Sequence, residues 1–157
     1  MVAPRRRRYA DLKVALVPDI RPNLGPLGGI HTALDHGAGR PVFVLACDMP
    51  LVTGDLVRWV AGHRPDNASG EPQDSKPWAR VVRDRHGAQP LCGLYSGACL
   101  PAVERALEEH RLSARDLLNH LETEVLDLDP GAAWYSPRLL SNVNVMRDLT
   151  ELAAALG

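Results

Sequence analysis

A run of apolar residues that ends in an aspartate most constrains how this chain can fold: residues 41–50 read PVFVLACDMP. Consecutive apolar residues with β-branched and aromatic members predict a strand over residues 42–47, buried on both faces of a parallel sheet. Pro50 has no backbone N–H to donate, so the strand has to end near Asp48. An aspartate at the carboxyl end of such a strand lies where α/β proteins bind their ligands.

Asp48 is therefore the first candidate site residue. Its carboxylate offers the oxygen ligands that Mg²⁺ prefers, and Mg²⁺ in such sites often bridges to substrate phosphates. The alternative is a structural aspartate that caps the turn after the strand. Residue type and position alone leave both interpretations open.

The rest of the sequence alternates strand patterns with helical patterns. This alternation predicts an α/β sheet with crossover connections, in a single domain over residues 1–157. Residues 1–12 are polar and basic and are expected to be frayed. Strands are predicted over residues 13–17, 42–47, 78–83, 89–95 and 124–128, and helices over residues 30–36, after Thr53, near Pro101, after Ser113 and at the carboxyl terminus.

A second carboxylate and a glycine-rich stretch follow the first predicted strand. Asp19 comes directly after Pro18, which ends that strand. Residues 20–29 are predicted to form a loop that contains GPLGG, and its glycines permit close backbone approach to a ligand. A glycine-rich loop that opens a helix presents free N–H groups to an anion. The spacing matches neither the dinucleotide fingerprint nor the Walker loop.

Charge and cysteine content exclude several classes of protein. A formal net charge of −1 argues against a nucleic-acid binder that works by bulk charge, and the basic run at residues 5–8 is typical of a solvated terminus. Three cysteines without a C-x-x-C spacing give no disulfide framework. The sequence has no signal-peptide pattern and no apolar run of membrane length. We therefore expect a cytoplasmic protein without nucleic-acid or membrane partners.

Four stretches taken in order resemble the molybdenum cofactor guanylyltransferases, within the wider nucleotidyltransferase group. They are VPD at residues 17–19, GPLGGI at 25–30, CDMP at 47–50 and NVN at 142–144. QPL at residues 89–91 and GLY at 93–95 are similar to a later strand of that family. The resemblance implies a Rossmann-like three-layer nucleotidyltransferase fold with a mostly parallel sheet.

The family's activity and site residues follow from the resemblance. It implies transfer of GMP from GTP to the terminal phosphate of the molybdopterin cofactor, with Mg²⁺ as cofactor and release of pyrophosphate. Proteins that mature molybdoenzymes would be further partners. Asp48 would be the catalytic Mg²⁺ ligand that also meets the nucleotide, and Asp19 a GTP-binding carboxylate. The remaining implied residues are Gly25, Pro26, Leu27 and Gly29 along the nucleotide cleft, and Asn142 and Asn144 on the acceptor side.

Simpler roles are open for several of these residues. Asn142 and Asn144 could instead satisfy backbone groups ahead of the last helix. Trp78, Trp134 and Tyr135 are expected to be packing residues, and stacking of such an aromatic side chain on a pterin is the alternative.

The sequence departs from the family at its start. The family opens with a strand and an L-x-G-G-x-S-x-R-M-G-x-D-K loop that cradles the triphosphate, and neither is present here. The expectation is an N-terminally truncated fold, which would leave strand edges unpaired and favour aggregation or oligomers. Activity of this short chain alone is therefore open. The alternatives are a related nucleotidyltransferase with another nucleotide or acceptor, and a non-catalytic protein that binds the cofactor or a partner.

Overall fold

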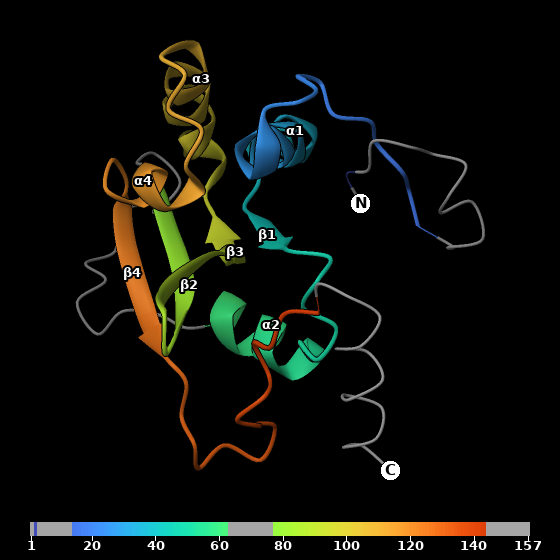
Figure 1. Cartoon of the computed structure of the whole chain (residues 1–157), viewed down its shortest axis with the longest axis vertical. Helices are drawn as coiled ribbons and strands as arrows, with labels where there is room; N and C mark the ends of the chain where they lie inside the picture. Colours follow the sequence, from blue (N-terminus) through green and yellow to red (C-terminus); the bar gives the residue numbers. More distant parts are fainter. Residues whose placement is uncertain (1, 3–13, 63–76, 144–157) are drawn as a thin grey trace.

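The computed structural model describes residues 2, 14–62 and 77–143, which form a four-stranded sheet with helices packed against it (Figure 1). The sheet order is β1-β3-β2-β4. The strands are β1 (Val42–Leu45), β2 (Trp78–Asp84), β3 (Gly87–Tyr95) and β4 (Glu122–Asp127). The helices are α1 (Gly25–Gly37), α2 (Gly54–Gly62), the 3₁₀ turn η3 (Gly97–Cys99), α3 (Leu100–Glu108) and α4 (Ala114–Leu118).

Three of the four described strands run in the same direction. β3 pairs antiparallel with both β1 and β2, whereas β2 and β4 pair in parallel. It follows that β1, β2 and β4 are co-directional and that β3 alone runs the other way. The predicted α/β fold is confirmed, and the sheet is mostly parallel in strand direction although two of its three pairings are antiparallel. The carboxyl ends of three strands consequently lie at one edge.

The prediction that residues 42–47 are buried on both faces among parallel neighbours is wrong for the described sheet. β1 covers only Val42–Leu45, lies at the end of the strand order and pairs antiparallel with β3. Its residues are half-buried, and Leu45 is 42% exposed. A short apolar run cannot by itself distinguish a central strand from an edge strand.

Two expectations near the start of the described chain are also corrected. The predicted strand at residues 13–17 is reduced to a single parallel bridge between Val17 and Val2. The predicted glycine-rich loop is the first turn of α1, which begins at Gly25 and not at residue 30. Proline suits the first turn of a helix, where its missing N–H has no partner to lose, so Pro26 favours the earlier start.

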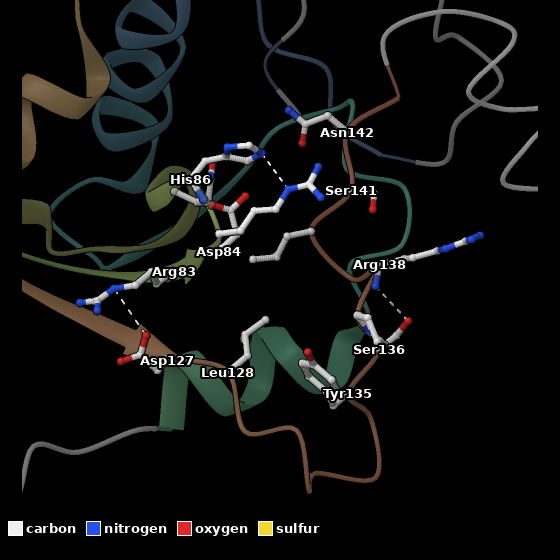
Figure 2. Close-up of a pocket in the computed structure, with 14 residues that line it drawn as sticks. Arg83, Asp84, His86, Asp127, Leu128, Tyr135, Ser136, Arg138, Ser141 and Asn142 are labelled. Carbon is white, nitrogen blue, oxygen red and sulfur yellow. Dashed lines mark hydrogen bonds and ion pairs between the residues drawn. The ribbon is translucent and has the colours of Figure 1, made fainter.

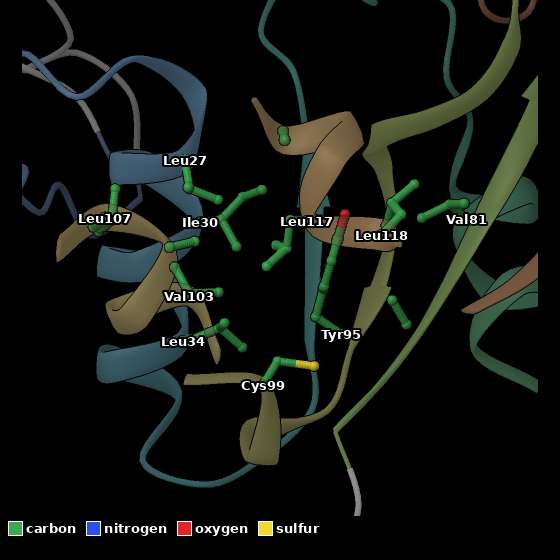
Figure 3. Close-up of a cluster of buried hydrophobic side chains, with 13 residues drawn as sticks. Leu27, Ile30, Leu34, Val81, Tyr95, Cys99, Val103, Leu107, Leu117 and Leu118 are labelled. Atoms are coloured by element: carbon green, nitrogen blue, oxygen red, sulfur yellow. The ribbon is translucent and has the colours of Figure 1, made fainter. Parts of the chain in front are cut away.

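Two apolar cores lie on opposite faces of the sheet, which confirms a three-layer arrangement. The first joins α1, α3 and α4 to one face and surrounds the buried Tyr95 (Figure 3). The second lies under α2 and includes Leu56, Val60 and Met49. Side chains alternate between the faces along β2, because Val81 belongs to the first core and Val82 to the second.

Arg80 fastens the sheet to α2. Its side chain is 4% exposed, and its Nε lies 2.6 Å from the Glu124 carboxylate of β4. Its Nη1 donates to the carbonyl of Val60 near the end of α2 at 3.1 Å, and the guanidinium carbon lies 5.5 Å from the centroid of the Trp78 ring. One buried cation thus connects β2, β4 and α2.

The hairpin of β2 and β3 has the predicted position but an irregular ladder. The pairing shifts between Val81 and Val82, opposite the part of β3 that contains Pro90, which has no N–H to donate. Tyr95 donates its hydroxyl hydrogen to the carbonyl of Pro90 at 2.6 Å and so stabilises the irregular segment. At Gly93 a Cβ atom would lie 2.4 Å from the carbonyl oxygen of Arg80, so this close approach requires glycine.

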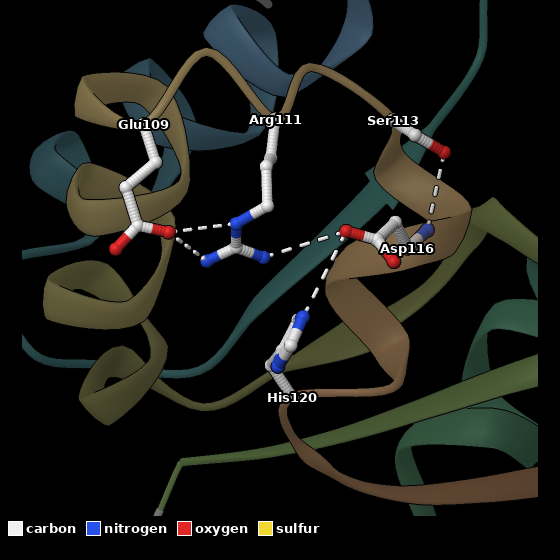
Figure 4. Close-up of polar contacts among 5 residues, drawn as sticks. All are labelled: Glu109, Arg111, Ser113, Asp116 and His120. Atoms are coloured by element: carbon white, nitrogen blue, oxygen red, sulfur yellow. Dashed lines mark hydrogen bonds and ion pairs between the residues drawn. The ribbon is translucent and has the colours of Figure 1, made fainter.

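Short polar contacts hold the smaller elements in place. Thr53 Oγ1 accepts from the N–H of Leu56 at the start of α2, as predicted. Ser113 caps α4 by accepting from the N–H of Asp116, whose carboxylate also lies near Arg111 and His120 (Figure 4). Of the helices in the part of the chain described here, none combines the length and apolar character needed to cross a membrane.

Candidate active site

Asp48 lies at the sheet edge where the co-directional strands end. The N–H of Ala46 donates to the carbonyl of Leu91 at 2.8 Å and carries the β1–β3 pairing one residue past Leu45. The chain then turns, and the N–H of Met49 donates back to the carbonyl of Ala46 at 3.3 Å. The Met49 side chain is 4% exposed and anchors the turn in the second core. The predicted position of Asp48 after a strand is confirmed.

The carboxylate of Asp48 has an unusual environment. Its Oδ1 atom is buried and has no hydrogen-bond partner among the described residues. Burying a charged oxygen without a partner is costly, and such sites are commonly balanced by a cation or an ordered water. No group of three or more His, Cys, Asp or Glu side chains that could hold a metal occurs within residues 14–62 and 77–143. A lone carboxylate oxygen without a protein partner is compatible with a hard cation that takes its other ligands from water or substrate oxygens.

The turn at Asp48 is connected to the segment that carries the predicted acceptor-side asparagines. The N–H of Val143 donates to the carbonyl of Asp48 at 2.7 Å. This bond brings Asp48 of the CDMP stretch and Val143 of the NVN stretch side by side. Asn142, the residue before Val143, is exposed. Asn144 lies outside the described residues.

A polar pocket of about 850 Å³ lies at the same edge of the sheet (Figure 2). It is formed by the β2–β3 turn, the end of β4 and the segment that leads to Val143. Because that segment is bonded to the backbone of the Asp48 turn, the part of the pocket lined by Asn142 adjoins that turn, although Asp48 is not itself a lining residue. The pocket is lined by Arg83, Asp84, Arg85, His86, Gln89, Asp127, Leu128, Tyr135, Ser136, Pro137, Arg138, Leu140, Ser141 and Asn142.

Positive charge exceeds negative charge in this pocket, which contains three arginines and two aspartates. Arg83 is paired with Asp127 at 3.4 Å across β2 and β4. Arg85 donates from Nε to His86 Nε2 at 2.9 Å and has no carboxylate partner in the described part of the chain. The N–H of His86 donates to Asp84 Oδ1 at 2.7 Å, which fixes the turn.

The predicted nucleotide-side residues lie apart from this pocket, around the start of α1. Asp19 is half-buried just before that helix. The neighbouring N–H of Ile20 donates to Thr32 Oγ1 at 3.0 Å, and that hydroxyl donates to the carbonyl of Gly28 at 3.0 Å. These two bonds hold the Asp19 segment against the first turns of α1.

The first turn of α1 differs from the predicted cleft-lining loop. Gly25 has a φ of 60°. The N-cap residue is Leu24, whose apolar side chain cannot accept a hydrogen bond, so the first N–H groups of α1 have no side-chain cap. Gly25 and Pro26 are exposed and Gly29 is half-buried. Leu27 is fully buried in the first core, so its side chain does not line a cleft. The correction follows from the helix period, which places Leu27 with Ile30 and Leu34 on the inward face.

Sequence reasoning missed the pocket residues of the hairpin. The sequence indicates only a connection between the strands predicted over residues 78–83 and 89–95, and no pattern there points to a role for Arg85 or His86. The strand order supplies the missing information, since β2 runs in the same direction as β1 and ends at the same edge. Tyr135 is half-buried and lines the pocket, so the choice between a packing role and stacking on a ligand stays open. Trp134 does pack, with its ring 5.4 Å from that of Trp59.

Comparison with known protein families gives a match along most of the chain. Residues 1–125 match the family described as the MobA-like NTP transferase domain. A relative from Flavobacterium johnsoniae, named as a probable molybdenum cofactor guanylyltransferase, is 28% identical over 93% of this chain and 70% of its own length. The molybdenum cofactor guanylyltransferase of Desulfosudis oleivorans is 26% identical over 94% of this chain and 69% of its own length.

A third relative, from Pelotomaculum thermopropionicum, carries the same name as the first and is 36% identical over 67% of this chain. The match spans 46% of that relative's length. The matches thus cover between 46% and 70% of the length of these three relatives.

Solved structures share the fold. Molybdopterin-guanine dinucleotide biosynthesis protein A from Archaeoglobus fulgidus superimposes with a TM-score of 0.74, at 19% identity, over 98% of this chain and 77% of its own. A protein from Aquifex aeolicus gives a TM-score of 0.71 at 22% identity, over 92% of this chain and 69% of its own. At these identities the similarity establishes the architecture alone.

Proposed function

The chain belongs to the MobA-like NTP transferase family, and on that premise we propose that it transfers GMP from GTP to the terminal phosphate of molybdopterin. The products would be the guanine dinucleotide form of the molybdenum cofactor and pyrophosphate. The names of the relatives described above support this nucleotide and this acceptor. Use of GTP is consistent with a reaction in the cytoplasm, and proteins that mature molybdoenzymes would receive the product.

The buried, partnerless Oδ1 of Asp48 is the observation that carries this proposal. A carboxylate in that state is prepared to hold a divalent cation, and Asp48 is the residue that would hold Mg²⁺. When bound, Mg²⁺ supplies the charge neutralisation that attack of one phosphate on another requires. Asp48 itself would orient the ion at the sheet edge.

The substrates would occupy opposite sides of the Asp48 turn. On the nucleotide side, Asp19 and the uncapped first turn of α1, with Gly25 exposed, would contact GTP. On the acceptor side, Asn142 would contact molybdopterin, and its place in a pocket next to Asp48 supports this role. Catalysis of this kind rests on positioning and charge, and no protein nucleophile is needed.

Calorimetric titration of the full chain with GTP, in the presence and absence of Mg²⁺, tests the proposal. We expect Mg²⁺-dependent binding that Asp48→Asn weakens by about tenfold or more, since a charge-assisted contact contributes about 1.5–3 kcal/mol. The matched control is Asp55→Asn, an exposed aspartate of α2 that pairs with Arg58. Absence of GTP binding, or unchanged binding by the Asp48 variant, would overturn the proposal.

Transfer is tested separately from binding. The full chain, incubated with GTP, Mg²⁺ and molybdopterin, should release pyrophosphate and form the guanine dinucleotide. Binding of GTP without pyrophosphate release would instead favour a cofactor-binding role without catalysis.

A further inference from the structure

Thr32 is a buried polar side chain that joins α1 to the segment before it. Its side chain is 0% exposed, and its hydroxyl makes two hydrogen bonds. It donates to the carbonyl of Gly28 at 3.0 Å and accepts from the N–H of Ile20 at 3.0 Å. A threonine bond to the carbonyl four residues earlier is a common local feature of helices. The second bond is different, because it connects the helix to a residue twelve positions earlier in the chain.

The bond to Ile20 fixes the position of Asp19. Pro18 is exposed and the Ile20 side chain is 47% exposed, so apolar burial does little to hold this part of the chain. In the part of the chain that the structure describes, no other hydrogen bond joins residues 18–23 to α1. The N–H of Ile20 lies in the planar peptide group that also contains the Cα and carbonyl of Asp19. A bond to that N–H from Thr32 therefore restricts where the Asp19 side chain can lie.

The later part of the same segment packs against α1 at Gly28. A Cβ atom on Gly28 would lie 3.0 Å from the carbonyl oxygen of Arg21 and 3.3 Å from the Cβ of Leu24. Leu24 is half-buried and packs against the first core. Gly28 and Thr32 are four residues apart and so share one face of the helix. Residues 19–24 consequently lie along this face, in contact with it at both positions.

We propose that Thr32 is a positioning residue of the nucleotide site: it acts through Asp19, by holding that carboxylate against the first turn of α1. The inference rests on the proposed function, in which Asp19 and that turn contact GTP. A ligand that binds two groups at once gains affinity when their relative position is fixed before binding. Thr32 is fully buried, so its own side chain does not reach the ligand. Its effect on GTP binding therefore passes through the segment that it holds.

Titration calorimetry of the full chain with GTP and Mg²⁺ tests the role of the hydroxyl. Thr32→Val keeps the shape of the side chain and removes the hydroxyl, and we expect it to weaken GTP binding by about tenfold, comparable to the loss of one contact to a charged group. Thr32→Ala lacks the same hydroxyl without placing an extra methyl group in the core, and should have a similar effect. Thr32→Ser keeps both hydrogen bonds and should restore the affinity to within about twofold of the parent.

Thr123→Val is the matched control for loss of a threonine hydroxyl. Thr123 lies in β4, is half-buried and donates to the carbonyl of Leu118 at 2.8 Å. The control should leave GTP affinity unchanged. An equal loss of affinity in the Thr32 and Thr123 variants would show a general loosening of the fold, and the inference would be wrong. Failure of Thr32→Ser to restore binding would also count against it.

A double-mutant cycle tests whether Thr32 acts through Asp19. Asp19→Asn should itself weaken GTP binding by about tenfold, since it removes a charged contact. Adding Thr32→Val to Asp19→Asn should lower the affinity by no more than about a further twofold, because the contact that Thr32 positions is already lost. A second tenfold loss would show that the two residues act independently and would overturn the inference.

Amide hydrogen exchange of the parent tests the structural premise without GTP and without a variant that has to fold. The Ile20 amide should exchange at least about tenfold more slowly than in an unstructured chain. Exchange at the unstructured rate would contradict the role of Thr32. In Thr32→Val the same amide should lose its protection, while amides in the β2–β3 pairing keep theirs.

The outcomes for this inference differ from those for the proposed function. Absence of GTP binding by the parent would overturn the proposed function and with it the nucleotide role of Thr32. GTP binding by the parent that both Thr32→Val and Thr32→Ala leave unchanged would overturn this inference alone. In the transfer assay, Thr32→Val should raise the KM for GTP by about tenfold and leave the KM for molybdopterin unchanged. An equal rise in both constants would contradict a role on the nucleotide side.

Discussion

Val143 donates its backbone N–H to the carbonyl of Asp48 at 2.7 Å, and this bond joins segments that are far apart in the sequence. It fixes the turn that carries Asp48, whose Oδ1 atom is buried, against the end of the segment that lines a polar pocket. A backbone hydrogen bond of this kind does not depend on side-chain rotamers. The position of the Asp48 turn relative to the pocket is therefore set by the backbone. The arrangement gives the candidate site a rigid centre.

The isolated Asp48 carboxylate should reduce the stability of the metal-free protein. Asp48→Asn replaces a half-buried carboxylate whose Oδ1 atom is buried without a partner among the described residues, so we expect its unfolding free energy to match or exceed that of the parent by about 1 kcal/mol. Urea denaturation without Mg²⁺ measures this difference. Asp55→Asn, at an exposed position, should leave stability nearly unchanged. A clear loss of stability in Asp48→Asn would show that the carboxylate has a structural partner.

Local patterns in the sequence predicted the regular elements well. The β2–β3 hairpin and the helix starts capped by Thr53 and Ser113 follow from turn, cap and periodicity rules that act over a few residues. The start of α1 differs from the prediction because glycine and proline favour loops on average. Here the burial of Leu27 in the first core stabilises the first turn as helix.

Features that depend on pairing between distant segments were not predictable in the same way. The edge position of β1 depends on its pairing with β3, which no local pattern encodes. The structure brings the segments of Asp48 and Asn142 to one edge of the sheet, while the roles that the ordered motifs imply for them stay predictions. The pocket itself was missed, because Arg85 and Tyr135 come together only through the strand order.

Glu124 should be important for stability because it balances a buried cation. Glu124→Ala leaves the Arg80 guanidinium, 4% exposed, without the carboxylate that lies 2.6 Å from its Nε. Breaking a buried pair on one side costs about 3–5 kcal/mol, and since Glu124 is itself 31% exposed we expect about 2–3 kcal/mol. Thermal or urea unfolding measures the loss.

The exposed ion pair between Arg83 of β2 and Asp127 of β4 supplies the control. Asp127→Ala removes the partner of Arg83 at 3.4 Å, where the side chains are 50% and 72% exposed, and should cost no more than about 0.5 kcal/mol. The double variant Arg80→Met, Glu124→Leu should recover much of the loss of Glu124→Ala, because it removes the buried charge together with its partner. Equal losses at Glu124 and Asp127 would contradict this account.

Burial of thiols should make the protein sensitive to alkaline pH. Desolvation raises the pKa of Cys92 from 9.0 to about 12, and burial also raises the pKa of Cys99 and Tyr95. Between about pH 9 and pH 12 the Cys92 thiol stays protonated in the folded state, whereas it is ionised in the unfolded state. The contribution of the buried neutral thiol to folding stability is therefore complete below pH 9 and is lost as the pH rises from about 9 toward 12. The loss should approach about 1.4 kcal/mol per pH unit.

Urea denaturation at a series of pH values between 8 and 11 checks this dependence. Cys92→Ala should lower stability at pH 8 but show a shallower fall above pH 9 than the parent. Thiol counting with a chromogenic disulfide at pH 8 is an independent check, in which Cys47, the exposed cysteine, should react fast and the buried Cys92 and Cys99 only on unfolding. Parallel pH curves for parent and variant would contradict the predicted role of Cys92.

The outer edge of β1 should promote self-association. Within the described residues no strand pairs with that edge, and Leu45 on it is 42% exposed. Unpaired strand edges with apolar side chains form sheets with other chains, and a lysine on the edge opposes this. We expect light scattering to show concentration-dependent oligomers of the parent and a shift toward monomer in Leu45→Lys. Leu112→Lys, at a residue 37% exposed between α3 and α4, controls for added charge. A monodisperse parent, or an equal effect of both lysines, would show that the β1 edge does not drive association.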